Sequence, residues 1–197
     1  MERLNVQGGG RSPRDLLPPP VGPGALFDVG DAQLVDVRGI ADFAGAHVPG
    51  AFCIPADMLA PFAGWFLDAE RDIVLVSRDA AQAEDAARTL ARIGYDRVRG
   101  YHAGIVPVAT QDKRFVSIPL VGISAVAERV EERPDGWTLL DVRAKDEFES
   151  GQVEGAFHAY VGKLPDAAAG VPKDGPVTVM CGGGNRPDRP ASLRRTR

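Results

Sequence analysis

The most constraining feature of this 197-residue sequence is an internal repeat. The stretch "LVDVRGIADFAGAHVPGAF" at 34–52 aligns without gaps to "LLDVRAKDEFESGQVEGAF" at 139–157, at an offset of 105 residues. A second pair, "DIVLVS" at 72–77 and "PVTVMC" at 176–181, follows at an offset of 104. Two matched blocks at nearly constant offset predict two duplicated domains, each close to the roughly 100 residues that a domain commonly has.

Within each repeat, strand patterns alternate with helix patterns. In the first repeat, the β-branched runs "AQLVDV", "IVLVS" and "YDRVRGY" predict buried strands of a parallel sheet. Between the last two runs, "AQAEDAARTLARIG" predicts an amphipathic helix that ends at Gly94. A further helix is predicted from about Ser124 to near Pro134. The fold class is therefore α/β, with each domain a small parallel β-sheet flanked by helices.

The boundaries follow from composition and from the repeat. Residues 1–24 contain "GGGRSP" and "PPPVGPG" and are predicted to form a Pro/Gly-rich arm or linker. Residues 25–110 form the first predicted domain and residues 117–197 the second. Only sixteen residues follow Cys181, and prolines interrupt them, so we expect the second domain to be truncated at its C-terminus. Its covering helix and the pairing of its final strand are expected to be lost, as a frameshift or truncated gene model would produce.

Composition excludes several classes of function. A hydrophobic fraction of 44% and a charged fraction of 25% are typical of a globular protein. The net charge of −4 gives no support to nucleic-acid binding. No apolar run approaches the ~20 residues of a membrane span, and the first residues lack a signal peptide, so a cytoplasmic location is expected. The two cysteines have no zinc-site spacing, and we expect neither a metal nor a cofactor.

Cys181 stands where a nucleophile is expected. It follows a predicted strand, and open α/β sheets place their sites at the carboxyl ends of strands. Gly182, Gly183 and Gly184 allow the backbone to turn its N–H groups inward into an anion-binding nest, with Asn185 and Arg186 beside it. Such donors favour the thiolate and would hold a bound sulfur anion. The alternative is a plain glycine loop beside a small buried thiol.

The first repeat has Ser77 at the position of Cys181, and "SRDAAQAED" lacks the glycines of a cradle. Ser77 has no thiol, so the first domain lacks the nucleophile and is predicted to be catalytically silent. Cys53 is expected to be a buried structural thiol.

Both repeats resemble rhodanese (sulfurtransferase) domains, through "VDVRGIADFAGAHVPGAFCIP" in the first and "LDVRAKDEFESGQVEGAFHAY" with "CGGGNR" in the second. More narrowly, "RDLLPPP", "FAGWFLDAERDIVLV" and "LARIGYDRVRGY" resemble the rhodanese pair fused to metallo-β-lactamase-fold proteins of the persulfide dioxygenase type. The metal-binding domain of those proteins has no counterpart here.

The resemblance implies that Cys181 takes sulfane sulfur from thiosulfate or a persulfide and passes it to a thiol or cyanide. The backbone from Gly182 to Arg186 would cradle the sulfur, and Asp141 and Arg143 would support the site by charge-assisted hydrogen bonds. Implied partners are small sulfur-containing anions and thiols, and a metallo-β-lactamase-fold persulfide dioxygenase. The alternative is a non-catalytic rhodanese-like module for docking or regulation. A Cys-dependent phosphatase or arsenate reductase is disfavoured, since the related phosphatase loops are one residue longer.

Overall fold

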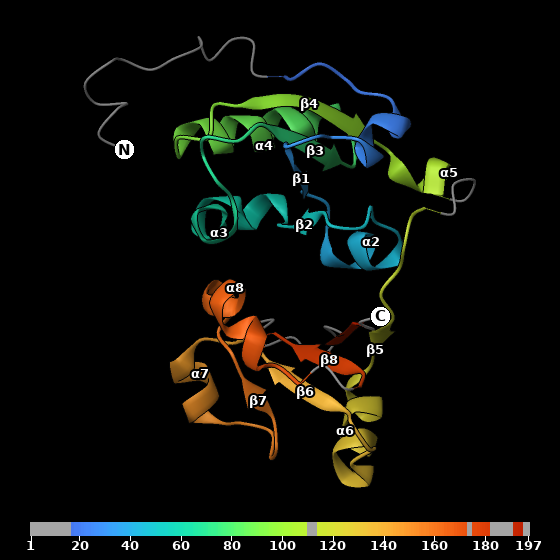
Figure 1. Cartoon of the computed structure of the whole chain (residues 1–197), viewed down its shortest axis with the longest axis vertical. Coiled ribbons are helices and arrows are strands. Elements are labelled where there is room, and N and C mark those ends of the chain that lie inside the picture. The colour runs from blue at the N-terminus through green and yellow to red at the C-terminus, as the bar shows by residue number, and fades with distance from the viewer. Residues whose placement is uncertain (1–16, 110–113, 173–174, 182–190, 195–197) are drawn as a thin grey trace. The chain divides into compact units, whose positions relative to one another are not determined.

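The computed structural model describes residues 17–109, 114–172, 175–181 and 191–194. The chain divides into two compact units, residues 1–117 (unit 1) and 118–197 (unit 2). Each unit is built on its own β-sheet with helices packed against it, and Figure 1 shows their elements in chain order. The α/β class and the two sheets predicted from the repeat are confirmed.

Unit 1 contains a four-stranded parallel sheet in the order β2-β1-β3-β4. Its strands are β1 (Gln33–Asp36), β2 (Phe52–Cys53), β3 (Ile73–Ser77) and β4 (Val98–Ala103). Its helices are the 3₁₀ turns η1 (Pro23–Phe27) and η2 (Ala56–Met58), and α2 (Ile40–Gly45), α3 (Leu59–Phe66), α4 (Ala80–Arg92) and α5 (Ile105–Ala109).

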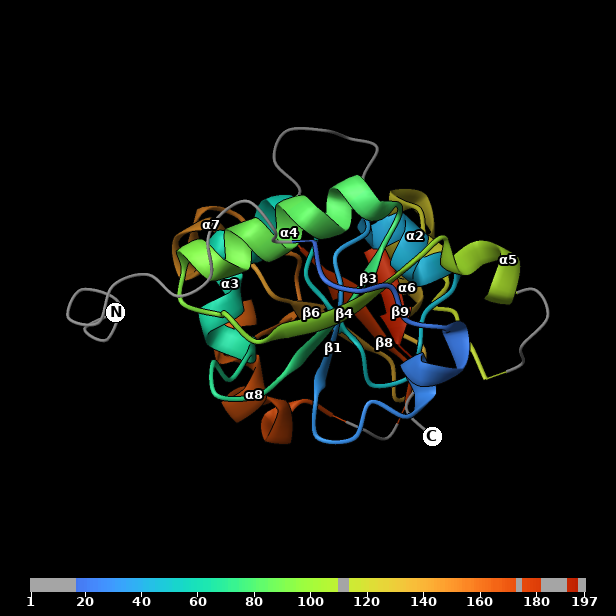
Figure 2. The same ribbon diagram turned by 90° about the horizontal axis from the view of Figure 1, so that it is seen from above.

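Side chains of the two central strands alternate between two hydrophobic clusters. Val35 and Leu75 belong to the cluster that contains α3 and α4 residues, whereas Leu34 and Val74 belong to the cluster that contains Leu26 and Ile105. This alternation is what a strand buried on both faces requires. Figure 2 shows α4 running along one side of the sheet, and α4 contacts both β3 and β4. The helix predicted to end at Gly94 is confirmed, because α4 stops at Arg92 and Gly94 has a φ of 91°.

Unit 2 contains a five-stranded sheet in the order β5-β9-β8-β6-β7. Its strands are β5 (Leu120–Val121), β6 (Thr138–Asp141), β7 (Phe157–His158), β8 (Val177–Met180) and β9 (Ala191–Arg194). Its helices are α6 (Ile123–Glu132), α7 (Lys145–Ser150), α8 (Leu164–Ala167) and the 3₁₀ turns η3 (Val161–Lys163) and η4 (Ala168–Gly170). The three strands β7, β6 and β8 are parallel, and they correspond to β2, β1 and β3 of unit 1.

Unit 2 is the shorter unit, as expected, but the expectation that the edge of β8 is left unpaired is wrong. β9 lies beside β8, but it runs antiparallel to it, with Thr178 opposite Leu193. In unit 1 the corresponding place beside β3 belongs to the parallel strand β4, reached through α4. Only ten residues, 181–190, separate β8 from β9. A parallel crossover needs a dozen or more residues, so a chain this short can return only in the opposite direction.

Candidate active site

Cys181 is the first residue after β8, and it is exposed. The backbone N–H of Val142 donates to the carbonyl of Met180 at 2.9 Å, which keeps the carboxyl ends of β6 and β8 side by side. The thiol therefore lies at the carboxyl end of a parallel strand, as the sequence predicts. The predicted cradle residues Gly182, Gly183, Gly184, Asn185 and Arg186 lie outside the described residues.

Asp141 and Arg143 form a clamp at the end of β6. The Asp141 carboxylate is fully buried and accepts hydrogen bonds from the Arg143 backbone N–H (3.0 Å), Nε (3.0 Å) and Nη2 (2.7 Å). The same Nη2 donates to the Gly151 carbonyl at 2.8 Å, at the end of α7. The hydrogen bond to Asp141 raises the pKa of Arg143 above its ordinary value, against a smaller opposing effect of burial. Arg143 therefore ties α7 to the sheet.

His158 extends this clamp from the neighbouring strand. Its Nε2 lies 2.9 Å from the carbonyl oxygen of Arg143, and its ring stacks on Phe148 with centroids 4.2 Å apart. A carbonyl only accepts, so Nε2 carries the proton in this contact. Sequence reasoning gave His158 no role. The repeat shows only that His158 takes the position that Cys53 has in unit 1, and the register that brings it beside Asp141 is seen in the structure alone.

Unit 1 repeats the clamp with a deeper burial. Asp36 accepts from the Arg38 Nη2 at 2.6 Å and the Nε at 2.9 Å, and Nη2 also donates to the Ala46 carbonyl at 2.7 Å. The Arg38 side chain is 3% exposed, compared with 19% for Arg143. The remaining amino group of Arg38, Nη1, is buried without a hydrogen-bond partner in the described part of the chain.

The strand end that corresponds to Cys181 carries a different arrangement in unit 1. Ser77 is fully buried, and its Oγ donates to the Asp79 carbonyl oxygen at 2.9 Å. The Asp79 carboxylate accepts from the Gln82 N–H at 2.8 Å and so caps α4. This hydrogen bond is the main cause of the lowered pKa of Asp79. The N-terminus of α4 is thus already occupied by the carboxylate of Asp79.

Cys53 is half-buried on β2, beside Asp36. Burial, and then the negative charge of Asp36, raise the pKa of its thiol from 9.0 to about 12, with a smaller lowering effect of Arg38. A thiol with this pKa is protonated at neutral pH, and the thiolate is the nucleophilic form. Cys53 is therefore not a reactive group under ordinary conditions.

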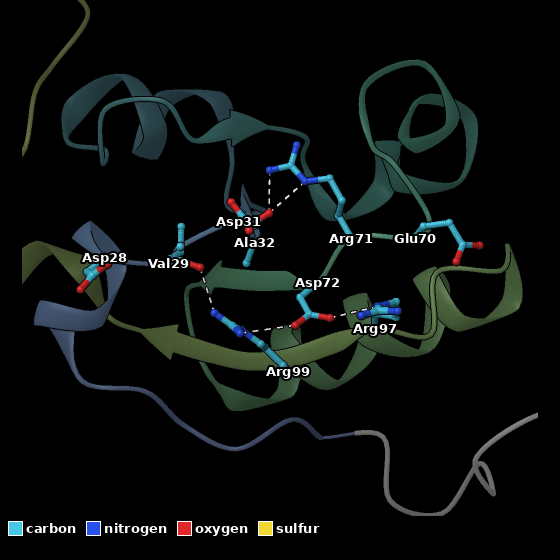
Figure 3. A pocket seen from close by; sticks show the side chains of 10 residues that line it. Asp28, Val29, Asp31, Ala32, Glu70, Arg71, Asp72, Arg97 and Arg99 are labelled. Carbon is cyan, nitrogen blue, oxygen red and sulfur yellow. Dashed lines mark hydrogen bonds and ion pairs between the residues drawn. The ribbon is translucent and has the colours of Figure 1, made fainter.

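A charged cleft of about 530 Å³ lies at the N-terminal ends of β1, β3 and β4, which is the end of the unit 1 sheet opposite to Ser77. Figure 3 shows Asp72 between Arg97 and Arg99. The Asp72 carboxylate accepts a hydrogen bond from the Arg97 Nε at 3.0 Å and one from the Arg99 Nη1 at 3.4 Å. Arg71 and Arg99 donate to the backbone carbonyls of Asp31 and Val29, which fixes the loop before β1. The residues that line this cleft include no cysteine, serine or histidine, so it offers no thiol, hydroxyl or imidazole for sulfur transfer.

Neither a metal cluster nor a membrane span is found in the described ranges. No group of three or more His, Cys, Asp or Glu side chains there is placed to hold a metal ion. Of the described helices, none is long and apolar enough to cross a membrane.

Comparison with known proteins gives one family. A family model described as "Rhodanese-like domain" matches residues 24–110 and 125–196. A sulfurtransferase from Allochromatium vinosum is 32% identical over 81 residues, which are 41% of this chain and 75% of that protein.

Two solved structures align more weakly. The anaerobic ergothioneine biosynthesis enzyme from Chlorobium limicola, in complex with trimethyl histidine, has a TM-score of 0.44 and 19% identity over 73% of this chain and 41% of its own. A metallo-beta-lactamase from Staphylococcus aureus has a TM-score of 0.39 and 26% identity over 47% of this chain and 25% of its own. The chain therefore spans less than half the length of either solved structure.

Proposed function

Because this chain belongs to the rhodanese-like domain family, we propose that it is a sulfurtransferase in which Cys181 of unit 2 carries the transferred sulfur. The observation that carries this proposal is the position of Cys181, an exposed thiol at the carboxyl end of a parallel strand. The family match and the sulfurtransferase relative support transfer of sulfur in general. The donor, the acceptor and the roles of individual residues are part of the proposal.

The proposed reaction has two steps of thiolate and sulfur exchange. The Cys181 thiolate attacks the outer sulfur of thiosulfate, the sulfur–sulfur bond of the donor breaks, and sulfite leaves with the bonding electron pair. Cys181 now holds a persulfide anion. Cyanide or an acceptor thiolate then attacks the terminal sulfur, which releases thiocyanate or a new persulfide and restores the thiolate. No external base is required once the attacking thiol is ionised.

The residues around Cys181 have separate tasks in this proposal. The backbone N–H groups from Gly182 to Arg186 hold the negative charge of the persulfide. Asp141 and Arg143 keep the loop after β6 in place beside the end of β8, and the Arg143 Nη2 is already shared by Asp141 and Gly151. Arg143 therefore acts as a positioning residue and not as a direct ligand of the sulfur.

Our second proposal is that unit 1 has a non-catalytic role. Ser77 is fully buried and hydrogen-bonded to Asp79, and Asp79 occupies the start of α4. An anionic substrate at this position would meet a carboxylate. Unit 1 would then contribute packing or docking to the activity of unit 2.

Thiocyanate release tests the function directly. The full chain, supplied with thiosulfate and cyanide, is expected to produce thiocyanate, and mass spectrometry is expected to find one added sulfur on Cys181 after thiosulfate alone. Cys181→Ser should abolish both signals, whereas the matched control Cys53→Ser should keep both. A folded wild-type protein that produces neither signal would favour the non-catalytic module for the whole chain.

A further inference from the structure

The segment before η1 lies along the outer edge of β4. The Val21 backbone N–H donates to the Tyr101 carbonyl at 2.7 Å, and the Tyr101 N–H donates to the Pro19 carbonyl at 3.0 Å. The His102 Nδ1 lies 2.8 Å from the Val21 carbonyl oxygen. Figures 1 and 2 both show the start of the described chain following β4. We call Pro18–Val21 the strap.

Gly100 makes this close approach possible. A Cβ at position 100 would lie 2.7 Å from the Val21 Cγ1, a distance that real Cβ contacts essentially never show. Valine is stiff at its first side-chain torsion, so Cγ1 cannot move away freely. Val21 also packs against the cluster that contains Leu26 and Ile105. A side chain at position 100 and a seated strap therefore exclude each other.

The position of the strap matters because β4 is otherwise the last strand of its sheet. An edge strand presents unpaired N–H and C=O groups that can recruit another chain. In β4, both outward groups of Tyr101 are used by the strap. The exposed Pro19 and Pro20 of the strap have no backbone N–H, so the new edge offers fewer donors to a further strand.

We propose that the strap seals the β4 edge of unit 1, and that its release exposes this edge to pairing with a second copy of the chain. Two released β4 strands are self-complementary about a two-fold axis. In an antiparallel pair centred on Tyr101, each Tyr101 would donate its N–H to the carbonyl of the other, as hydrogen-bonded antiparallel positions do. This inference is independent of the sulfurtransferase proposal.

The first experiment uses the full chain with Gly100→Ala, and Gly64→Ala as the matched control. Gly64 lies in α3 with no atom within 4 Å of an added Cβ, so the same substitution there meets open space. Hydrogen exchange of the Tyr101 and Val21 amides is expected to rise by roughly tenfold or more in Gly100→Ala, given the strain of overpacking. Light scattering is expected to show association that increases with concentration, with Gly64→Ala unchanged from the wild type.

A rescue variant separates strap release from general damage. In Gly100→Ala/Val21→Ala the atom closest to the new Cβ is gone, and the next contact is the Pro19 carbonyl at 3.5 Å. The double variant should exchange and associate no more than Val21→Ala alone. If Gly100→Ala does not fold, Val21→Ala supplies the test, because the loss of apolar contact should release the strap in part and cause weak association.

Three results would overturn the proposal. The Tyr101 amide could stay protected in Gly100→Ala, which means that the strap is not displaced. Exchange could rise without any association, which means that the strap does not guard the edge. The double variant could be as impaired as Gly100→Ala, which means that the clash does not involve Val21.

Discussion

At the scale of single residues, the two cysteines differ through their surroundings. Cys181 is exposed at a strand end, whereas Cys53 is half-buried next to Asp36. The pKa of Cys53 rises from 9.0 to about 12, so its thiolate fraction at neutral pH is roughly 1,000-fold lower than that of a free cysteine. The sequence alone predicted an unreactive Cys53, and its burial with a nearby carboxylate gives the physical cause.

Alkylation should therefore distinguish the two thiols. With iodoacetamide at pH 7, we expect Cys181 to be labelled in the folded protein and Cys53 to be labelled only after denaturation. Peptide mass spectrometry measures both sites in one sample. Equal labelling of both cysteines in the native state would contradict the assigned environment of Cys53.

The same shift predicts a loss of stability in alkali. The folded state keeps the Cys53 proton until the pH approaches about 12, whereas the unfolded chain releases it from about pH 9. The free energy of unfolding should therefore be unaffected by this group below pH 9 and should fall between pH 9 and 12. Denaturation curves of Cys53→Ser should lack this part of the pH dependence.

The clamps of the two units give unequal mutational effects. Removal of the Asp36 carboxylate leaves Arg38, at 3% exposure, as a buried unpaired charge, which typically costs about 3–5 kcal/mol. Asp141→Ala should cost less, because Arg143 is 19% exposed and water can solvate it. Asp72→Ala is the control, since its exposed pairs with Arg97 and Arg99 are worth under ~1 kcal/mol each.

Urea denaturation of each variant measures these costs. Trp65 lies in unit 1 and Trp137 in unit 2, so a variant that retains one tryptophan reports on one unit. Equal losses for Asp36→Ala and Asp72→Ala would show that burial does not set the cost.

At the scale of elements, α4 shows how one side chain positions a helix. Asp79 caps its first turn, and Gln82 in return accepts from the Arg78 N–H and donates to the Val37 carbonyl at 3.2 Å. These bonds connect the start of α4 to the loop after β1. The helix is amphipathic, and its Ala83, Ala86, Ala87 and Leu90 side chains are buried against the sheet.

Replacement of the cap should loosen this connection. Asp79→Ala should lower the denaturation midpoint of unit 1 and Asp79→Asn should largely retain it, because asparagine is an equally good cap. The pKa of Asp79 is lowered in the folded state, so the benefit of its charge is present above the unfolded value of 3.8 and is lost as the pH falls through the folded one. The midpoints of the wild type and of the Asp79→Asn variant, followed by Trp65 fluorescence, should therefore converge in acid.

At the scale of the whole molecule, the repeat predicted both sheets, because matched β-branched runs at constant offset are a local and strong signal. The helices α4 and α6 were equally clear, since Gly94 and Pro134 mark their ends. The antiparallel strand β9 was missed, because the sequence "ASLR" at 191–194 has no β-branched run to mark a strand, although its partner β8 is close in the chain. The strap was also missed, because Pro18–Pro20 carry no strand pattern and are held by the surface of β4.

The candidate site was predictable only in part. The chemistry of Cys181 follows from its residue type and its place after a strand, and the Asp-Val-Arg triplet points to the two clamps. The role of His158 depends on the register of β7 against β6, which sequence alone did not supply. The depth of Arg38 relative to Arg143 also depends on tertiary packing, since the two triplets are identical in sequence.

The pairing of β5 with β9 has a mechanical consequence for unit 2. Leu120 lies opposite Ser192 in an antiparallel pair, so the start of β5 and the end of β9 lie at the same end of the pair. A pulling force applied between these two points would load one hydrogen bond at a time, as when a zipper opens. Strands that are loaded in this way separate at low force. When the chain is stretched, β5 and β9 should therefore come apart well before the parallel strands β6 and β8 are sheared from each other.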